Sequence, residues 1–207
     1  MNRKEYFTTI ADIVPGDELR YIQNAYHLAK DAHRKQSRRL TGERYFEHIR
    51  RVSFDVATRF HYTSAHYISL ALLHDVIEDT YTPPSFIVSL FGRQMYDDIL
   101  FLSKEVPSFN FVTGEVIGKF KLPDHEYYET LSNATKAARV IKGCDRIDNL
   151  ADLVSWEPSR RERYVTETRG RIIPIVRSVD LRIANTIEER LTAAETKDPA
   201  PKEQFKR

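Results

Sequence analysis

The amino-acid sequence predicts an all-α protein. Apolar residues recur at helical spacing through most of the 207-residue chain, and the alternating patterns that are typical of strands are nearly absent. No internal repeat divides the chain, and its length suits one domain, which we place at residues 1–194. A polar, proline-containing tail over 195–207 follows, and we expect it to be disordered.

Composition and charge limit the classes of function. With 41% hydrophobic and 30% charged residues, the chain has the composition of a soluble globular protein, and its net charge of +2 gives no general affinity for nucleic acid or anionic membranes. We see neither a secretory signal nor an apolar run near the roughly 18 residues that span a bilayer. The single cysteine, Cys144, fits a reducing compartment. We therefore expect a cytoplasmic protein without nucleic-acid or membrane partners, and the sequence favours no particular oligomeric state.

Three helices are predicted in the N-terminal third. A short amphipathic helix over 2–14 ends at the Pro-Gly pair that follows it, and Asp17 is a suitable N-cap for the second helix. The third helix covers 46–60 and carries His48 near its start. Between the second and third helices lies a basic segment, 34–39. A solvated connector is one interpretation of this segment, and a ligand-binding loop is the other.

The middle of the chain combines short helices with an irregular stretch. Ser64 can cap a helix that carries the string LLHDVIEDT at 72–80, and helices over 82–90 and 94–103 follow. Residues 105–123 contain proline and glycine among aromatic residues. We expect a long loop there, within which a small β-hairpin can form, and loops of this length are usually functional or mobile.

The C-terminal half is again helical. A helix over 124–138 is followed by one that ends near Trp156, by a third over 159–179 with Gly170 and Pro174 as kink points, and by a last one that reaches about Ala194. On the second of these helices, Asp145 falls near the inward-facing apolar stripe. A buried carboxylate is costly without a partner, so this position suggests a bound cation.

Four potential ligands stand out on three predicted helices. They are His48, His74, Asp75 and Asp145. Two imidazoles and two carboxylates form a mixed nitrogen and oxygen set that suits a borderline or hard divalent metal. If the run before His74 continues as a helix, His74 and Glu78 stand four residues apart on one face. A buried polar network without a metal is the alternative interpretation.

These positions resemble the ligand pattern of the HD phosphohydrolase superfamily, and more narrowly the hydrolase domain of RelA/SpoT-type alarmone enzymes. The matching segments read AHRKQSRRLTGERYFEH at 32–48, ALLHDVIEDT at 71–80, FG at 91–92 and IKGCDRIDNL at 141–150. The resemblance covers about 25–153, and the acidic pair within VIEDT distinguishes these enzymes from HD proteins generally. The chain length is that of a stand-alone small alarmone hydrolase similar to the metazoan SpoT homologue.

The resemblance implies an HD-domain helical bundle and a role for each matching residue. The implied ligands of one Mn²⁺ ion are His48, His74, Asp75 and Asp145. The implied catalytic residues, which would orient a water or shuttle a proton, are Glu78 and Asp79. The implied reaction removes the 3′-pyrophosphate of the stringent-response alarmones ppGpp and pppGpp, and yields GDP or GTP plus pyrophosphate. The suggested substrate contacts are Arg38, Arg39, Lys104, Lys142, Arg146 and Asn149. Of these, Lys142 and Arg146 have the alternative of pairing with structural acids.

Departures from the family pattern leave alternatives open. Ile49 stands where the family often has proline. The segment before Gly42 is one residue longer than in the bacterial enzymes, so Arg38 and Arg39 are both candidates for the nucleotide-contacting arginine. Because 105–123 matches the family little, the nucleotide is the least constrained part of the prediction. An HD phosphohydrolase that acts on an adenine alarmone, NADPH or a deoxynucleotide is one alternative, and a non-catalytic nucleotide-binding regulatory module is another.

Overall fold

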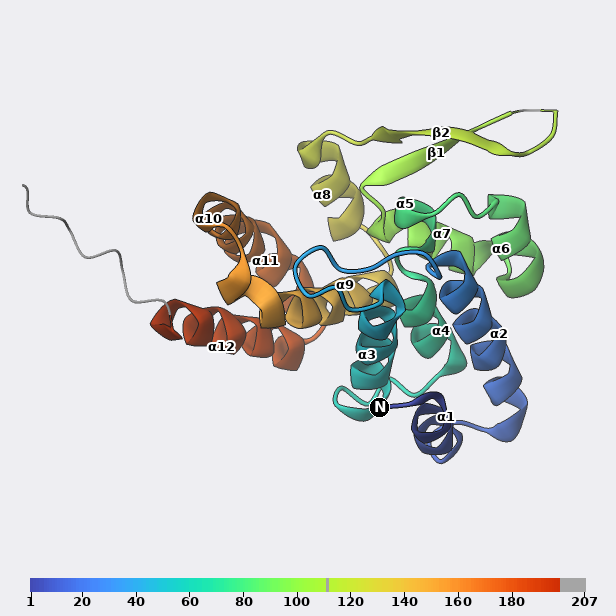
Figure 1. The fold of residues 1–207 in the computed structure, drawn as a ribbon, viewed down its shortest axis with the longest axis horizontal. Coiled ribbons are helices and arrows are strands. Elements are labelled where there is room, and N and C mark those ends of the chain that lie inside the picture. Colours follow the sequence, from blue (N-terminus) through green and yellow to red (C-terminus); the bar gives the residue numbers. More distant parts are fainter. Residues whose placement is uncertain (111, 198–207) are drawn as a thin grey trace, which may run out of the picture.

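The computed structural model describes residues 1–110 and 112–197, and Figure 1 shows a bundle of helices with one small hairpin. The predicted all-α fold is confirmed for these residues. Most of the tail expected over 195–207 lies outside them. Within the described ranges, no helix is both long and apolar enough to cross a membrane.

Short helices joined by tight connections follow one another along the chain. The helices are α1 (Arg3–Ala11), α2 (Gly16–Ala32), α3 (Tyr45–Thr58), α4 (Ala65–Leu73), α5 (Val76–Asp79), α6 (Pro84–Phe91), α7 (Arg93–Leu102), α8 (Asp124–Ser132), α9 (Lys136–Asn149), α10 (Pro158–Glu167), α11 (Ile173–Arg177) and α12 (Leu181–Lys197). The strands are β1 (Glu105–Phe109) and β2 (Val116–Lys121). A 3₁₀ segment (Leu150–Ser155) follows α9, and a π-helical segment (Thr168–Ile172) joins α10 to α11.

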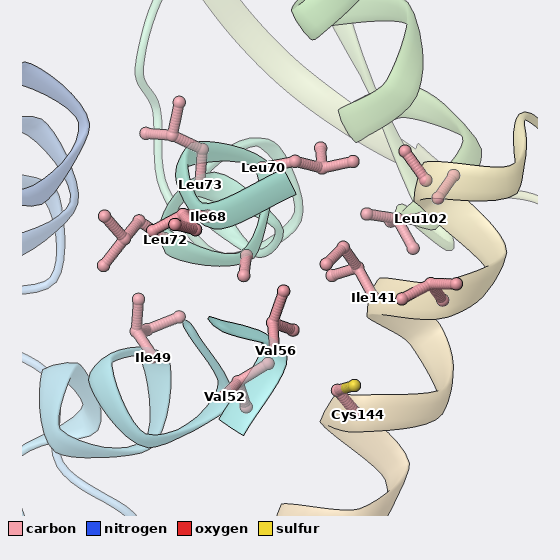
Figure 2. Packing of buried hydrophobic residues seen from close by; sticks show 14 of the residues in the cluster. Ile49, Val52, Val56, Ile68, Leu70, Leu72, Leu73, Leu102, Ile141 and Cys144 are labelled. Carbon is pink, nitrogen blue, oxygen red and sulfur yellow. The ribbon is translucent and has the colours of Figure 1, made fainter. Parts of the chain in front are cut away.

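Helix α4 lies at the centre of the bundle. It packs against α2, α3 and α9, and it is buried along almost its whole length. Figure 2 shows Val56 of α3, Leu70 of α4 and Ile141 of α9 in one cluster of buried side chains. A helix that is apolar on all sides needs neighbours on all sides. This requirement draws together α3, α4 and α9, and each of them carries or adjoins a predicted metal ligand.

The opposite face of α9 is closed by the C-terminal helices. Gly143 approaches α11 and α12 so closely that a Cβ atom there would lie 2.5 Å from Cγ2 of Ile183 and 2.9 Å from Cγ1 of Val176. Carbon atoms in contact are normally about 3.5–4.0 Å apart, so only glycine fits without a shift of its neighbours. Helix α9 is therefore held between the central helices and the C-terminal pair.

Two predicted helices are interrupted in the structure. The expected helix over 124–138 is wrong, because α8 ends at Ser132 and Thr135 caps the start of α9. The cap is a hydrogen bond from the amide of Ala138 to the Thr135 hydroxyl at 3.1 Å. The expected helix over 159–179 contains the π-helical segment between its two α-helical parts.

The stretch over 105–123 forms a β-hairpin within the expected loop. Strands β1 and β2 pair antiparallel, with an irregularity between Ser108 and Phe109. Gly114 takes a positive φ of 71° in the turn, where its amide donates to the carbonyl of Asn110 at 2.8 Å. The hairpin lies above α5 in Figure 1, and β1 contacts that helix. It is therefore placed against the helix that carries the acidic pair.

Candidate active site

The central helix α4 ends where the His-Asp motif begins. His74 is its C-cap, and Asp75 takes φ −103° and ψ 0° before α5 starts at Val76. The Nδ1–H of His74 donates to the carbonyl of Ala71 at 2.7 Å, an acceptor that a continuous helix would pair with the amide of Asp75. The expected continuous helix from His74 to Glu78 is therefore interrupted by a turn.

Four side chains from different parts of the chain meet at this helix end. Asp75 Oδ2 lies 3.0 Å from His74 Nε2 and 3.7 Å from His48 Nε2. Asp145 Oδ1 lies 3.4 Å from His48 Nε2 and 3.8 Å from His74 Nε2. One ligand atom from each of His48, His74 and Asp145 lies within 4.8 Å of the others. All four residues that the sequence suggests as ligands thus come together.

The histidine rings are arranged as metal ligands would be. Each Nδ1 is fixed by an acceptor, the Ala71 carbonyl for His74 and Asp148 Oδ2, at 2.7 Å, for His48. Both Nε2 atoms are buried without a hydrogen-bond partner. Buried polar atoms normally have hydrogen-bond partners, so the two Nε2 atoms are unusual. In metal-ligating histidines the other ring nitrogen typically donates a hydrogen bond to a carbonyl or carboxylate, as both Nδ1 atoms do here. With the two carboxylates, these nitrogens form a set that could hold a divalent metal.

Charge pairing governs the titration of this cluster. Burial alone would lower the pKa of His48, but the carboxylates around it raise that pKa to about 9. Burial would raise the pKa of Asp145, but the Lys142 ammonium and the two imidazoles hold it well below its usual range. Lys142 Nζ donates to Asp145 Oδ2 at 3.2 Å. Because metal-bound imidazoles are neutral, metal binding here would release protons.

The acidic pair Glu78 and Asp79 lies on α5, beside the cluster. Glu78 Oε2 accepts a hydrogen bond from the amide of Lys104 at 2.7 Å, and the Glu78 carbonyl accepts one from Lys119 Nζ at 2.6 Å. Burial raises the pKa of Glu78 to about 7. Loss of hydration, with the charge of Asp75 adding to it, raises the pKa of Asp79 to about 6. Groups that titrate near neutral pH are suited to general acid and base catalysis.

A cleft of about 690 Å³ opens next to these residues. Two residues that line the cleft are hydrogen-bonded to the His/Asp cluster. The Tyr45 hydroxyl donates to Asp75 Oδ2 at 2.6 Å, and Asn149 Nδ2 donates to Asp145 Oδ1 at 2.6 Å. Three of the predicted substrate contacts line the cleft, namely Arg38, Arg39 and Asn149. The lining also includes an aromatic and basic group, which comprises Trp156, Arg160 and Tyr164. The cleft therefore offers both positive charge and flat ring surfaces.

The other three predicted substrate contacts are engaged with acids of the protein. Lys142 is held by Asp145, as described above. Lys104 Nζ lies 3.3 Å from Glu167 Oε1, and Arg146, which is buried, donates to the same oxygen at 2.8 Å. For Lys142 and Arg146, this pairing is the alternative role that the sequence left open.

Two residues at the site lie in the matching segments but are given no role by the sequence. They are Tyr45 and Asp148. Tyr45 stands three residues before His48, and Asp148 stands three after Asp145, so each shares a helical face with a predicted ligand. That spacing is the available signal. The aromatic and basic group of the cleft has no comparable signal in the sequence.

Comparison with known proteins identifies bacterial relatives of the chain, although no protein-family profile matches it. The bifunctional (p)ppGpp synthase/hydrolase SpoT of Escherichia coli K12 is 28% identical over an alignment of 191 residues, and the match covers 88% of this chain and 25% of that protein. A guanosine-3′,5′-bis(diphosphate) 3′-pyrophosphohydrolase of Aquifex aeolicus is 32% identical over an alignment of 174 residues, and the match covers 81% of this chain and 23% of that protein. The chain thus spans about a quarter of the length of these relatives.

Two metazoan proteins match over most of their own length. The Drosophila melanogaster guanosine-3′,5′-bis(diphosphate) 3′-pyrophosphohydrolase MESH1 is 29% identical over an alignment of 138 residues, and the match covers 64% of this chain and 72% of that protein. A solved structure of a metazoan orthologue of SpoT that hydrolyses ppGpp matches with a TM-score of 0.69 at 22% identity, and the match covers 84% of this chain and 94% of that one. This structural match establishes the shared fold.

Proposed function

Because this chain is homologous to the hydrolase domain of SpoT and to a metazoan ppGpp hydrolase, we propose that it is a metal-dependent alarmone hydrolase. The proposed reaction removes the 3′-pyrophosphate of ppGpp or pppGpp and yields GDP or GTP plus pyrophosphate. The observation that carries the proposal is the position of the acidic pair Glu78 and Asp79, which follows Asp75 of the His/Asp cluster on α5 and of which Asp79 lines the basic cleft. The single cysteine, Cys144, is buried and reduced, which supports a cytoplasmic location.

The cofactor that we propose is one Mn²⁺ ion. The residues that would hold it are His48, His74, Asp75 and Asp145. When bound, such an ion would lower the pKa of a bound water and neutralise charge on the phosphate. The two buried Nε2 atoms without partners, together with mixed nitrogen and oxygen donors, support a divalent metal at this position.

Proton transfer is the role that we propose for the acidic pair. Hydrolysis removes one proton from the attacking water and delivers one to the 3′-oxygen as it leaves. Because Glu78 and Asp79 both titrate near neutral pH, one can hold a proton while the other has lost it. The amide of Lys104 fixes the Glu78 carboxylate, and Gln36 Nε2 donates to the Asp79 carbonyl at 2.7 Å. These bonds limit the positions that the pair can take.

The cleft is the binding site that we propose for the nucleotide. Arg39 is exposed at its edge, and Arg38 is oriented by ion pairs with Asp148 at 3.3 Å and Asp152 at 3.1 Å. Arginine binds phosphate through paired N–H groups and stacks on planar rings. Asn149 connects the cleft to the cluster, so a nucleotide in the cleft could direct its 3′-pyrophosphate towards the proposed metal.

Product analysis tests this function. The purified protein is incubated with ppGpp and Mn²⁺, and the products are separated by anion exchange. We expect GDP and pyrophosphate, with activity lost on chelation and restored by metal. Parallel assays with Mg²⁺ and Zn²⁺ identify the preferred ion.

A substrate panel separates the alternatives. It contains pppGpp, an adenine alarmone, NADPH and a deoxynucleoside triphosphate. Turnover of one of the last three with ppGpp untouched would identify an HD phosphohydrolase of different specificity. Metal binding without turnover of any nucleotide would indicate a regulatory binding module.

A further inference from the structure

Asp148 is a carboxylate that three side chains share. Its Oδ2 atom accepts a hydrogen bond from His48 Nδ1 at 2.7 Å and one from Arg38 Nη1 at 3.3 Å. Arg51 donates to both oxygens, from Nε at 2.7 Å and from Nη2 at 3.1 Å. Only 12% of the Asp148 side chain is exposed. The carboxylate is therefore held in one orientation from several sides.

The bond to His48 decides which ring nitrogen faces the cluster. An acceptor at Nδ1 keeps a proton on that nitrogen and directs Nε2 to the ligand position. Nε2 is the atom that lies 3.4 Å from Asp145 and 3.7 Å from Asp75. A carboxylate behind a ligating histidine also fixes the orientation of the ring. His48 thus depends on Asp148 for its tautomer and for its direction.

The same carboxylate is tied to the loop 34–44, which contains the basic segment. Arg38 reaches Asp148 directly. Glu43 reaches it through Arg51, whose Nη1 donates to Glu43 Oε1 at 2.7 Å. Within the loop, the amide of Arg38 donates to the carbonyl of Glu43 at 2.8 Å, so the two arms are joined. Both arms of the loop therefore converge on Asp148.

We propose that Asp148 is a positioning residue that orients His48 for metal binding, and that Arg51 and Arg38 hold it in place. Asp148 is not one of the four proposed ligands, and it acts through one of them. The inference rests on the metal site of the proposed function but not on the identity of the nucleotide. It makes the loop 34–44 a support of the metal site as well as a wall of the cleft.

The Mn²⁺ affinity of Asp148→Asn tests this proposal, with Asp152→Asn as the matched control. Asparagine keeps the size of the side chain and removes its charge. Asp152 pairs with Arg38 as Asp148 does, but none of its described contacts reaches His48. Mn²⁺ is titrated without nucleotide, and the free ion is followed by electron paramagnetic resonance. We expect Asp148→Asn to bind Mn²⁺ about 10–100-fold more weakly, the range for a lost partner of a ligating histidine, and Asp152→Asn to bind as wild type does.

Arg51→Met provides a second, independent variant. It should weaken Mn²⁺ binding less than Asp148→Asn does, because the described contacts of Arg51 reach His48 only through Asp148. The double variant should bind no more weakly than Asp148→Asn alone. Melting temperatures of the metal-free proteins show which variants are folded. If Asp148→Asn does not fold, wild-type affinity in Arg51→Met overturns the proposal.

Wild-type Mn²⁺ affinity in a folded Asp148→Asn protein would also overturn the proposed role of Asp148. An equal loss of Mn²⁺ affinity in Asp152→Asn, or a wild-type protein that binds no Mn²⁺, would do the same. The proposed function fails by a different result. If the wild-type protein binds Mn²⁺ but leaves ppGpp intact, the proposed alarmone hydrolase function is wrong. The role of Asp148 can still be judged from the Mn²⁺ affinities of the variants.

Discussion

Among individual residues, Glu78 is a carboxylate whose ionised form is disfavoured by burial in the folded protein. Burial raises its pKa from 4.5 to about 7, so the charged form is less favourable in the folded protein than in the unfolded chain. Carboxylates with this property are concentrated at sites of proton transfer. If Glu78 is catalytic, its replacement should lower the rate and raise the stability.

We expect Glu78→Gln and Asp79→Asn to lower kcat by about 100-fold or more, the range for a lost general acid or base. Both replacements keep the size of the side chain, and neither residue is a proposed metal ligand, so the Mn²⁺ content should stay at the wild-type level. Single-turnover rates and metal analysis on the same preparations measure both quantities. Wild-type rates in both variants would remove the pair from the mechanism.

The stability of Glu78→Gln should depend on pH with a defined sign. The folded-state pKa of Glu78, about 7, lies above its unfolded value of 4.5, so the contribution of this group is most favourable below pH 4.5 and is lost as the pH rises through 7. Glutamine avoids that loss. We expect the variant to be more stable than wild type by about 1–3 kcal/mol at pH 8 and to have no advantage near pH 4. Urea unfolding of the metal-free proteins measures this, and destabilisation at both pH values would indicate a structural role.

Arg38 and Arg39 should contribute to substrate binding. Replacing either with alanine is expected to raise KM by about tenfold or more, the effect of losing a charge-assisted phosphate contact. Arg44→Ala is the matched control, because Arg44 belongs to the same loop but pairs with Glu47. Steady-state kinetics on the three single variants and on the double variant measure the effect. Wild-type kinetics in all of them would make the loop 34–44 a connector only.

Among the secondary-structure elements, apolar spacing predicted most helices, and the kink expected at Gly170 coincides with the π-helical segment, but two other interruptions were not predicted. The break at His74 is accompanied by a hydrogen bond from the imidazole of His74 to the carbonyl of Ala71 and by the approach of Asp145, which belongs to α9. No local sequence pattern contains the second contact. The break before α9 had local signals in Asn133 and the cap Thr135, but apolar residues continue at helical spacing on both sides of them. Periodicity therefore located the buried faces better than the ends.

The hairpin is an element whose contribution to the site became visible only in three dimensions. Its Lys119 donates to the Glu78 carbonyl and lies 5.1 Å from the centroid of the Tyr81 ring. The hairpin base adds the bond from the Lys104 amide to the Glu78 carboxylate. It thus holds both the backbone and the side chain of a proposed catalytic residue.

We expect Lys119→Met to lower kcat by about tenfold, the cost of one charged hydrogen bond, and to leave Mn²⁺ affinity unchanged. Lys121→Met is the control, because Lys121 is exposed on the same strand. Lys119→Cys followed by aminoethylation restores an ammonium group at nearly the original length, and the protein's own thiol, Cys144, is buried. Recovery of the rate on alkylation would identify the charge as the active feature. An unchanged rate in Lys119→Met would show that the Lys119 ammonium does not position the pair.

In the molecule as a whole, the site depends on contacts between segments that lie far apart in the chain. His48 and Asp148 are separated by 100 residues, and Arg38 and Asp148 by 110. The proposed metal ligands could be suggested one by one, because histidine and aspartate are unusual on apolar helix faces. The role of Asp148 could not, since charged residues there and at Arg51 fit a solvated surface equally well.

Gly143→Ala tests whether the C-terminal helices support the site through α9. The added methyl group would overlap Ile183 and Val176, and overpacking of this kind typically costs about 1–3 kcal/mol. We expect a lower Tm together with weaker Mn²⁺ binding, because a shift of α9 moves Asp145. Gly170→Ala is the control, since a Cβ atom there meets nothing within 4 Å. A lower Tm with wild-type Mn²⁺ affinity would show that the strain is relieved without moving Asp145.

The position of α9 between the two halves of the bundle has a consequence for protein synthesis. At about 5–20 residues per second, the roughly 40 residues from Asp145 to Ile183 take roughly 2–8 seconds to add. During that interval the ribosome carries a chain that has all four proposed ligands but lacks the helices that press α9 into place. We therefore expect the chain to take up its metal late, and released chains truncated before α12 should retain Mn²⁺ less well than chains that include it.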